Sequence, residues 1–298
     1  AEYSQQEALE LAQFARAAFC SPGSIDAWAC GEPCEAAPRP SAVLALSPGP
    51  DSRWQPQGLA ARLGAAGAHD AAASGPARCV VAFRGSLTLR NWVADADFPL
   101  VAWPGEGEDW CAGCHVHDGF AGAYAELRPA LMSALQELGC EQVVVTGHSL
   151  GGAIATLAAA ELRAGARLSV PMLLTFGSPR VGDPAFAAAF QARADSLGLA
   201  VPSWRVVHFH DPVPHLPPLG VPLLPYVHVA REVWYSLDFD SFQVCDASGE
   251  DPSCADSTPL ARTIGQGSEH THYLNLSFEH TELPAECLPG RATIGAYV

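Results

Sequence analysis

The stretch VVVTGHSLGGA, residues 143–153, passes from an apolar run into a segment of small residues and contains the pattern G-x-S-x-G at 147–151. The serine of that pattern occupies a strained, sharp turn between a strand and a helix, with its hydroxyl clear of the sheet. The two glycines leave room for strand and helix to approach each other. Amides at the start of the helix favour negative charge at the reaction centre. A chance match in a glycine-rich chain is the alternative, but the flanking strand and helix favour Ser149 as a nucleophile.

Apolar runs with the composition of buried strands recur along the chain. They are RCVVAFRGS (78–86), QVVVTGHS (142–149), MLLTFGSP (172–179) and WRVVHFHDPVP (204–214). Because their Val, Leu and Phe residues do not alternate with polar ones, we expect strands covered on both faces, as in a parallel sheet. The intervening stretches at 119–138, 150–164 and 183–195 are expected to be helices, as is the segment 5–19. This order predicts an α/β fold with right-handed crossovers.

The bulk composition is that of a globular protein, with 49% apolar and 16% charged residues among 298. The net charge of −16 argues against a nucleic-acid partner, because nucleic acids attract basic surfaces. No apolar run reaches the roughly 18 residues that a transmembrane helix needs. We therefore expect one domain over residues 1–298, present as a monomer.

Ten cysteines are many for this length and indicate disulfides formed in an oxidising compartment. The rival interpretation is a reduced protein with metal-bound thiols, but the spacings form no four-ligand zinc pattern. The chain begins AEYSQQEALELAQF, without a charged and then apolar leader. A mature secreted protein whose signal has been removed is the expectation that fits the cysteines.

The acid that supports a serine nucleophile of this kind follows a later strand, and a histidine comes after it. Two aspartates qualify, Asp183 in GSPRVGDP and Asp211 in VVHFHDPVPH. Asp211 directly follows its strand. Asp183 comes after a four-residue excursion and fits equally well as the N-cap of the next helix, with Pro184 at the first helical position. The sequence therefore favours Asp211.

At this point the chain resembles the fungal class 3 lipases, which are secreted triacylglycerol lipases. The resemblance rests on successive blocks in the same order: VVAFRGS, RNWVAD, VHDGFAGAYAEL, VTGHSLGGAIATLAA, TFGSPRVGDPAFA, RVVHFHDPVPHLPP and YVHVAREVWY. It implies an α/β-hydrolase fold, with a central mostly parallel sheet flanked by helices and a short helical lid. It also implies a Ser-Asp-His triad and neither a metal nor an organic cofactor.

The family's catalytic histidine stands three residues before a Tyr in a pattern like H-x-x-Y-F. HTHYL matches this with His270 and Tyr273, and Leu274 stands where an aromatic is usual. His272 is the rival base, because residues two apart in an extended segment face the same way. The spacing to Tyr273 favours His270. The third histidine of this stretch, His280, lies beyond the match and is expected at the surface.

Acyl transfer also needs hydrogen-bond donors for the oxyanion. The amide of Leu150, directly after the nucleophile, is one donor, and by resemblance Ser86 supplies the other. An ordinary helix N-cap is the alternative role for Ser86. The segment after it, within about 87–98, places Leu89, Trp92 and Val93 on one apolar stripe. A core-facing helix is the plain interpretation, and the family context favours a lid that opens at a lipid interface.

The cysteines suggest five disulfides. Close spacing suggests Cys30–Cys34, Cys111–Cys114 and Cys245–Cys254, the resemblance adds Cys20–Cys287, and Cys79–Cys140 would join two strands at one end of the sheet. CAGCH at 111–115 also matches haem-attachment and redox motifs, which an extracellular chain disfavours. A metal cluster of His208, His210 and His215 lacks a clear third ligand, so structural hydrogen bonds are favoured. Asn275 begins a possible N-glycosylation site.

These expectations combine into a secreted lipase that hydrolyses acylglycerol esters through an acyl-enzyme on Ser149, with peripheral contact to a lipid surface. Mono- and diacylglycerols are possible preferred substrates. A soluble-substrate carboxylesterase, such as a feruloyl esterase, is the alternative within the same chemistry. An inactive, lid-bearing lipid-binding protein is the alternative of another class, and the complete set of triad residues argues against it.

Overall fold

The structure is a computed structural model and describes residues 2–64, 76–86, 98–103, 111–165, 168–196, 203–222, 224–229, 231–264, 267–279 and 282–287. The lid expected within 87–98, with Leu89, Trp92 and Val93, falls almost wholly on residues 87–97, which lie outside these ranges. His280 lies outside them as well.

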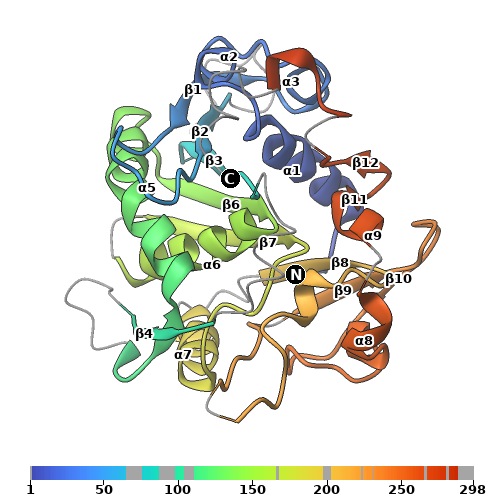
Figure 1. Cartoon of the computed structure of the whole chain (residues 1–298). Helices are drawn as coiled ribbons and strands as arrows, with labels where there is room; N and C mark the ends of the chain where they lie inside the picture. The colour runs from blue at the N-terminus through green and yellow to red at the C-terminus, as the bar shows by residue number, and fades with distance from the viewer. Residues whose placement is uncertain are drawn as a thin grey trace.

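A central sheet of eight strands runs through the described part of the chain in the order β1-β2-β3-β6-β7-β8-β9-β10 (Figure 1). The strands are β1 (Pro40–Leu46), β2 (Gly58–Leu63), β3 (Arg78–Phe83), β6 (Gln142–His148), β7 (Ser169–Phe176), β8 (Ser203–His208), β9 (Glu232–Tyr235) and β10 (Phe242–Val244). The run from β3 to β9 is parallel, and β1, β2 and β10 pair antiparallel with their neighbours. The mostly parallel sheet confirms the expected fold class.

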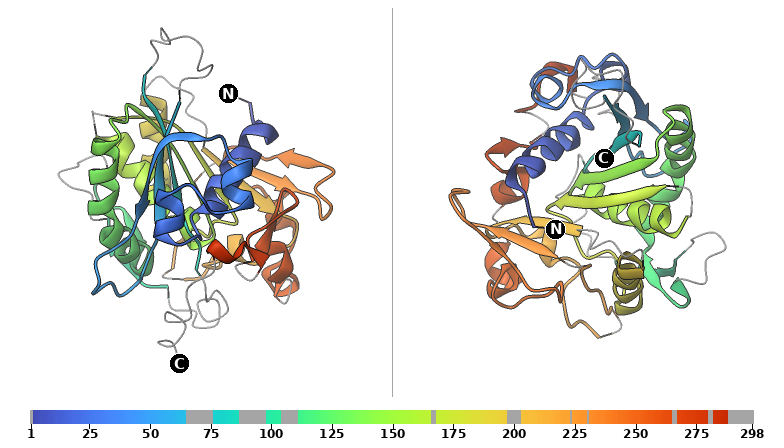
Figure 2. Two further views of the ribbon diagram at one scale, coloured as in Figure 1. Left: turned by 90° about the horizontal axis from the view of Figure 1, so that it is seen from above. Right: turned by 180° about the vertical axis from the view of Figure 1, so that it is seen from behind.

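Helices cover both faces of this sheet. Along β6, Val143 and Val145 belong to the apolar core under α5 (Asp118–Glu137) and α6 (Leu150–Ala164), whereas Val144 belongs to the core under α1 (Gln5–Ala17). Figure 2 shows the sheet between α1 on one side and α5 and α6 on the other. Because alternate side chains of a strand point to opposite faces, a strand buried on both faces must be apolar throughout. This is the physical reason for the unbroken valine runs.

The remaining elements are short, apart from α7 (Pro184–Ser196), which follows β7. The others are α2 (Pro22–Asp26), α3 (Glu32–Ala36), β4 (Leu100–Ala102), β5 (His115–His117), η2 (Val213–His215), η3 (Ala255–Ser257), α8 (Leu260–Thr263), α9 (Gly267–Thr271), β11 (His272–Tyr273), β12 (Leu276–Ser277) and η5 (Ala285–Cys287). In the described ranges, no helix is both long and apolar enough to cross a membrane.

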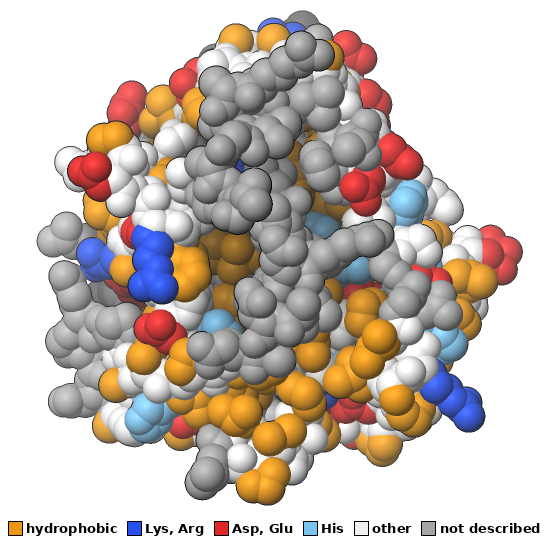
Figure 3. Space-filling model, in the orientation of Figure 1, with side chains coloured by type: hydrophobic (Ala, Val, Ile, Leu, Met, Phe, Trp, Pro, Cys, Tyr) orange, Lys and Arg blue, Asp and Glu red, His pale blue; other side chains and the backbone are white. Residues whose placement is uncertain are grey.

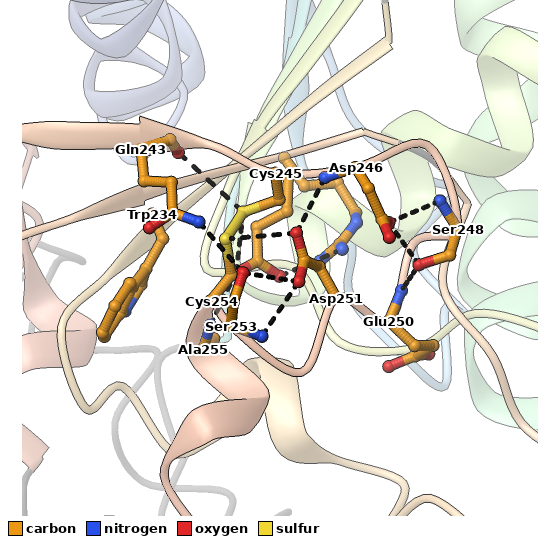
Figure 4. The surroundings of a disulfide bond; sticks show 12 residues. Trp234, Gln243, Cys245, Asp246, Ser248, Glu250, Asp251, Ser253, Cys254 and Ala255 are labelled. Atoms are coloured by element: carbon orange, nitrogen blue, oxygen red, sulfur yellow. Dashed lines mark hydrogen bonds and ion pairs between the residues drawn. A yellow bond between two sulfur atoms is a disulfide. The ribbon is translucent and has the colours of Figure 1, made fainter.

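All ten cysteines are in disulfides, in the pairs named from the sequence: Cys20–Cys287, Cys30–Cys34, Cys79–Cys140, Cys111–Cys114 and Cys245–Cys254. The last pair closes a surface loop in which Asp246 accepts hydrogen bonds from Ser248, and Asp251 accepts hydrogen bonds from Ser253 and from the amide of Asp246 (Figure 4). These bonds order the loop that follows β10.

The start of α6 packs against the end of β3 with no space for a side chain. A Cβ on Gly151 would lie 2.1 Å from the carbonyl oxygen of Phe83, and a Cβ on Gly147 would lie 2.3 Å from the carbonyl oxygen of Gly151. Real Cβ atoms do not approach backbone oxygens so closely. Both glycines are therefore required by the crossing of strand and helix.

Gly151→Ala is expected to destabilise the protein by more than about 3 kcal/mol, because the new methyl group meets backbone atoms that cannot move independently. Gly165→Ala, at the other end of α6, is the matched control, since its Cβ would meet its nearest neighbour at an ordinary 3.7 Å. Thermal unfolding followed by circular dichroism, with disulfides intact, measures both. Equal stabilities for the two variants would contradict the packing argument.

Candidate active site

Ser149 stands at the junction of β6 and α6 with φ 57° and ψ −126°, a backbone conformation that non-glycine residues rarely adopt. Its amide donates to the carbonyl of Phe176 at the end of β7, at 2.9 Å, which holds the turn in place. The residue is buried in this structure. The local geometry is that of a strained strand-to-helix turn.

Asp211 and His270 face each other across the same edge of the sheet. Asp211 follows β8 after a short turn, and His270 belongs to α9. The Nδ1 atom of His270 lies 2.9 Å from both carboxylate oxygens of Asp211, and both side chains are buried. A carboxylate in this position fixes the tautomer of the imidazole and stabilises its cation.

The carboxylate of Asp211 has two further donors. The amide of Val213 donates to Oδ1 at 2.8 Å, and the hydroxyl of Tyr273 donates to Oδ2. Burial alone would raise the pKa of Asp211. The charge of His270 and the hydrogen bonds from His270, Tyr273 and Val213 outweigh it and hold this pKa below its ordinary value. Asp211 is therefore a stable carboxylate inside the protein.

The sequence pattern uses Tyr273 only to identify the histidine and does not predict its contact with Asp211. Burial, and then the charge of Asp211, raises the pKa of the Tyr273 hydroxyl well above its ordinary value. The hydroxyl therefore remains protonated and donates to the carboxylate. The H-x-x-Y spacing was the available signal, but it does not say what the tyrosine contacts.

These groups converge on the serine turn. A Cβ on Gly177 would lie 2.8 Å from Oδ2 of Asp211 and 3.1 Å from Cε1 of His270. Gly177 directly follows Phe176, whose carbonyl accepts the amide of Ser149. The Nε2 atom of His270 is buried and has no hydrogen-bond partner among the described residues. No described residue thus competes for the lone pair of this nitrogen.

The expectation that His270 and His272 lie in one extended segment was wrong, because α9 ends at Thr271 and only His272 lies in a strand. His270 is buried against Asp211, whereas the side chain of His272 is 41% exposed and binds the carbonyl of Ser268 at 2.9 Å. The change from helix to strand between the two residues separates their directions.

Asp183, the alternative acid, is the N-terminal cap of α7. Its Oδ1 accepts the amide of Phe186 at 2.8 Å, and its Oδ2 lies 3.1 Å from Nδ1 of His115. An Asp with Pro at the next position is a common way to begin a helix. The carboxylate of Asp183 is thus used in local structure, away from His270.

Ser86 and Leu150 lie at the same end of the sheet as Ser149. β3 and β6 are parallel, and Phe83 pairs with Gly147. Ser86 therefore follows its strand by about the distance at which Ser149 and Leu150 follow theirs. Leu150 is the first residue of α6, so its amide is one of the free N–H groups at a helix N-terminus. Both residues are half-buried.

The three histidines whose spacing suggests a metal cluster have other contacts. Both ring nitrogens of His208 face backbone carbonyls, the ring of His210 stacks on Phe209, and Nδ1 of His215 lies 3.6 Å from Asp256. In the described ranges, only Glu232, Cys245 and Cys254 gather closely enough to hold a metal ion. Those two sulfurs are joined to each other, so they are not free as ligands.

A buried ion pair supports the loop that carries Asp211. Arg180 donates two hydrogen bonds to Glu250, at 2.9 and 2.7 Å, and a third to the carbonyl of Pro217. His228 donates from its amide to Glu250 and contacts the carbonyl of Pro214 through Nε2 at 2.8 Å. The disulfide loop containing Glu250 is thereby tied to the segment that follows Asp211.

Comparisons with known proteins relate this chain to lipases. Residues 80–221 match the family described as Lipase (class 3). A lipase from Rhizomucor miehei is 36% identical over 206 residues, which are 66% of this chain and 52% of that protein. A secreted mono- and diacylglycerol lipase A from Penicillium cyclopium is 40% identical over 159 residues, 52% of this chain and 47% of that protein. This chain thus spans about half the length of these relatives.

The fold is also similar to that of a triacylglycerol lipase whose structure is described as having a serine protease triad at its catalytic centre. The two chains superpose with a TM-score of 0.66 at 27% identity, over 93% of this chain and 97% of the other.

The free energy of unfolding is expected to fall as the pH is lowered from about 6.5 to about 4. Burial and the charge of His270 lower the pKa of His148 to about 3, burial and the charge of Arg180 lower that of His215 to about 4, and burial with the charge of Arg205 lowers that of His228. In the unfolded chain these residues titrate near pH 6.5, so unfolding takes up protons. The stabilising contribution is complete above pH 6.5 and is lost as the pH falls.

Asp256 opposes this trend, because burial and Glu250 raise its pKa to about 6. Its contribution is reduced by solvent, since the carboxylate is partly exposed. We expect a net loss of up to about 3 kcal/mol per pH unit. Urea unfolding at pH 6, 5 and 4, with disulfides intact, measures it. Stability that is flat or rising toward pH 4 would contradict the assignment of neutral buried histidines.

Proposed function

Because the match over residues 80–221 places this chain in the class 3 lipase family, we propose that it hydrolyses carboxylic esters of acylglycerols. The observation that supports the proposal best is the buried His270–Asp211 pair at the sheet edge that also carries the strained Ser149. Nucleophile, base and acid occur in the chain order Ser, Asp, His, as expected for a serine in a strand-to-helix turn.

In the proposed mechanism Ser149 Oγ attacks the ester carbonyl while Nε2 of His270 takes its proton. The tetrahedral intermediate collapses, the C–O bond to the alcohol breaks, and His270 returns the proton to the departing oxygen. Water then attacks the acyl-enzyme, again with His270 as the base, and releases the carboxylic acid and the free serine. Asp211 stays ionised throughout and stabilises the imidazolium.

The oxyanion of each tetrahedral intermediate needs donors that are already in place. The amide of Leu150 and the amide or hydroxyl of Ser86 are the proposed donors, and the N-terminus of α6 adds its partial positive charge. Each such donor contributes about 3–4 kcal/mol to transition-state stabilisation. Formation of this hole requires the close packing of α6 on β3 that Gly151 permits.

An apolar surface supports contact with a lipid. On the face seen in Figure 3, hydrophobic side chains gather across the lower half. Leu219 is 50% exposed in the loop before β9, and Ile264, directly after α8, is 69% exposed. Contiguous exposed apolar patches, rather than single exposed side chains, mark surfaces that contact another molecule or a membrane. The segment 87–98, with Leu89, Trp92 and Val93, is the proposed lid over the site.

The protein is also proposed to act outside the cell. Five disulfides require an oxidising environment, and some of the relatives are named as secreted lipases. Asn275 is exposed at the turn between β11 and β12, where a glycan would not disturb the core. We also propose that residues 1–298 form a single domain that acts as a monomer.

Ser149→Ala and His270→Ala are expected to lower kcat for a soluble short-chain ester by about 10⁴-fold or more, because each removes a group that acts as a unit with the others. Two matched controls test the assignment of base and acid: His272→Ala against His270→Ala, and Asp183→Asn against Asp211→Asn. Each control is expected to retain activity within about fivefold. An Asp183 or His272 variant as inactive as its counterpart would overturn the assignment.

Lipase and esterase are separated by initial rates measured across the solubility limit of tributyrin. A lidded lipase is expected to show a clear rise in rate once droplets form, because the apolar surface then finds lipid. Absence of any rise, with full activity on dissolved ester, would favour a soluble-substrate carboxylesterase. A panel of mono-, di- and triacylglycerols of one acyl chain then shows which of them is preferred.

A further inference from the structure

The backbone of the short helix that carries His270 is held from outside. α9 has five residues, so a helix of this length has little stability of its own and cannot satisfy its last four carbonyls. Each of these carbonyls has a partner outside the helix. The carbonyl of Ser268 lies 2.9 Å from Nδ1 of His272, and that of Glu269 lies 3.0 Å from Nδ1 of His208. The carbonyl of His270 lies 2.7 Å from Nε2 of His148, and that of Thr271 accepts the amide of Phe278 at 2.7 Å.

His148 is the last residue of β6 and directly precedes Ser149. A carbonyl oxygen only accepts hydrogen bonds, so the proton of the His148 ring is on Nε2. Burial and the charge of His270 lower the pKa of His148 to about 3, which keeps this ring neutral when His270 gains a proton. The ring stacks on Phe278 at 4.4 Å, and its Nδ1 has no partner in the described part of the chain. Its one hydrogen bond goes to the base.

His208 is the last residue of β8 and stands three positions before Asp211. It is buried and stacks on Phe239 at 4.1 Å. Its Nδ1 faces the carbonyl of Glu269, and its Nε2 faces the carbonyl of Leu237 at 3.1 Å. A neutral ring can donate to only one of the two, so the tautomer decides whether His208 serves α9.

We propose that His148 and His208 are positioning residues that hold the backbone of the base. This inference rests on the proposed function of Ser149, Asp211 and His270. β6, which leads to the nucleophile Ser149, ends at His148, and β8, which leads to the acid Asp211, ends at His208. Their two hydrogen bonds hold the successive carbonyls of Glu269 and His270, and thereby set the position and the direction of the His270 side chain relative to Asp211. His272 acts on Ser268 from the surface, where water replaces it.

Loss of an anchor would leave a buried carbonyl without a donor and let α9 shift. A displacement of about 1 Å is enough to cost about 100-fold in rate, because proton transfer depends steeply on distance and direction. The α9 carbonyls are bonded to groups of the protein, so we do not expect them to contact the substrate. The expected signature is therefore a lower kcat at an unchanged KM.

Amide side chains test the two anchors separately, because the amide nitrogen of Gln occupies the position of histidine Nε2 and that of Asn the position of Nδ1. His148→Gln and His208→Asn keep the donor to α9, whereas His148→Asn and His208→Gln lose it. The variants that lose the donor are expected to show kcat lowered by about 10- to 100-fold on a soluble p-nitrophenyl ester. The variants that keep it are expected to stay within about fivefold of the wild type, so the better amide differs between the two positions.

A merely structural role predicts a different result, in which Asn and Gln act alike at each position, or activity follows the melting temperature. Either result, or a change confined to KM, would overturn the proposal. The downfield NMR signal of the His270 Nδ1 proton, which reports its bond to Asp211, gives a second readout. This signal should weaken in His148→Asn and His208→Gln, the two variants that lose the donor to α9.

The two proposals fail in different ways. If the chain is not an ester hydrolase, the wild-type protein shows no more hydrolysis than Ser149→Ala, and the NMR order of the variants still tests the anchors. If the wild type hydrolyses the ester and the reversal between Asn and Gln is missing, only the anchoring role is refuted.

Discussion

The parallel register of β3, β6, β7 and β8 is the constraint on which the rest of the structure depends. It brings the carboxyl ends of these strands to one edge of the sheet. Ser86, Ser149 and Asp211 each follow the end of their own strand by one to three residues, so they lie at this same edge. A parallel sheet must be covered on both faces, which requires the valine-rich strands and the helical layers beside them. The pairing of the strands thus places Ser86, Ser149 and Asp211 together, and α9, much later in the chain, adds His270.

Burying the carboxylate of Asp211 is costly unless it is fully bonded, and the surroundings meet this requirement from three segments. His270, Tyr273 and the amide of Val213 all donate to it. The same donors hold it ionised, so the stabilisation of the fold and the electrostatics of the site have one origin. Because its lowered pKa keeps His148 neutral, its ring can lie 4.7 Å from the His270 ring without placing a second positive charge beside it.

Much of this arrangement follows from sequence because it is local. Strand runs, the glycines of the Ser149 turn and the helix cap at Asp183 each depend on a few neighbouring residues. The relative directions of His270 and His272 were not predicted correctly, because the short helix α9 ends at Thr271, between them, and the stability of this helix comes from distant donors. The contacts of Tyr273 with Asp211, and of His148 and His208 with α9, join residues more than 60 positions apart. No spacing rule encodes such pairs.

The bridge between Cys20 and Cys287 joins residues 267 positions apart and closes the chain between them into a covalent ring. A single cut in any exposed loop between these cysteines would leave the two pieces covalently linked through this disulfide. In a medium rich in proteases, such a molecule would lose loops before it lost its architecture. Closure of the ring thus favours persistence after damage, a benefit separate from resistance to unfolding.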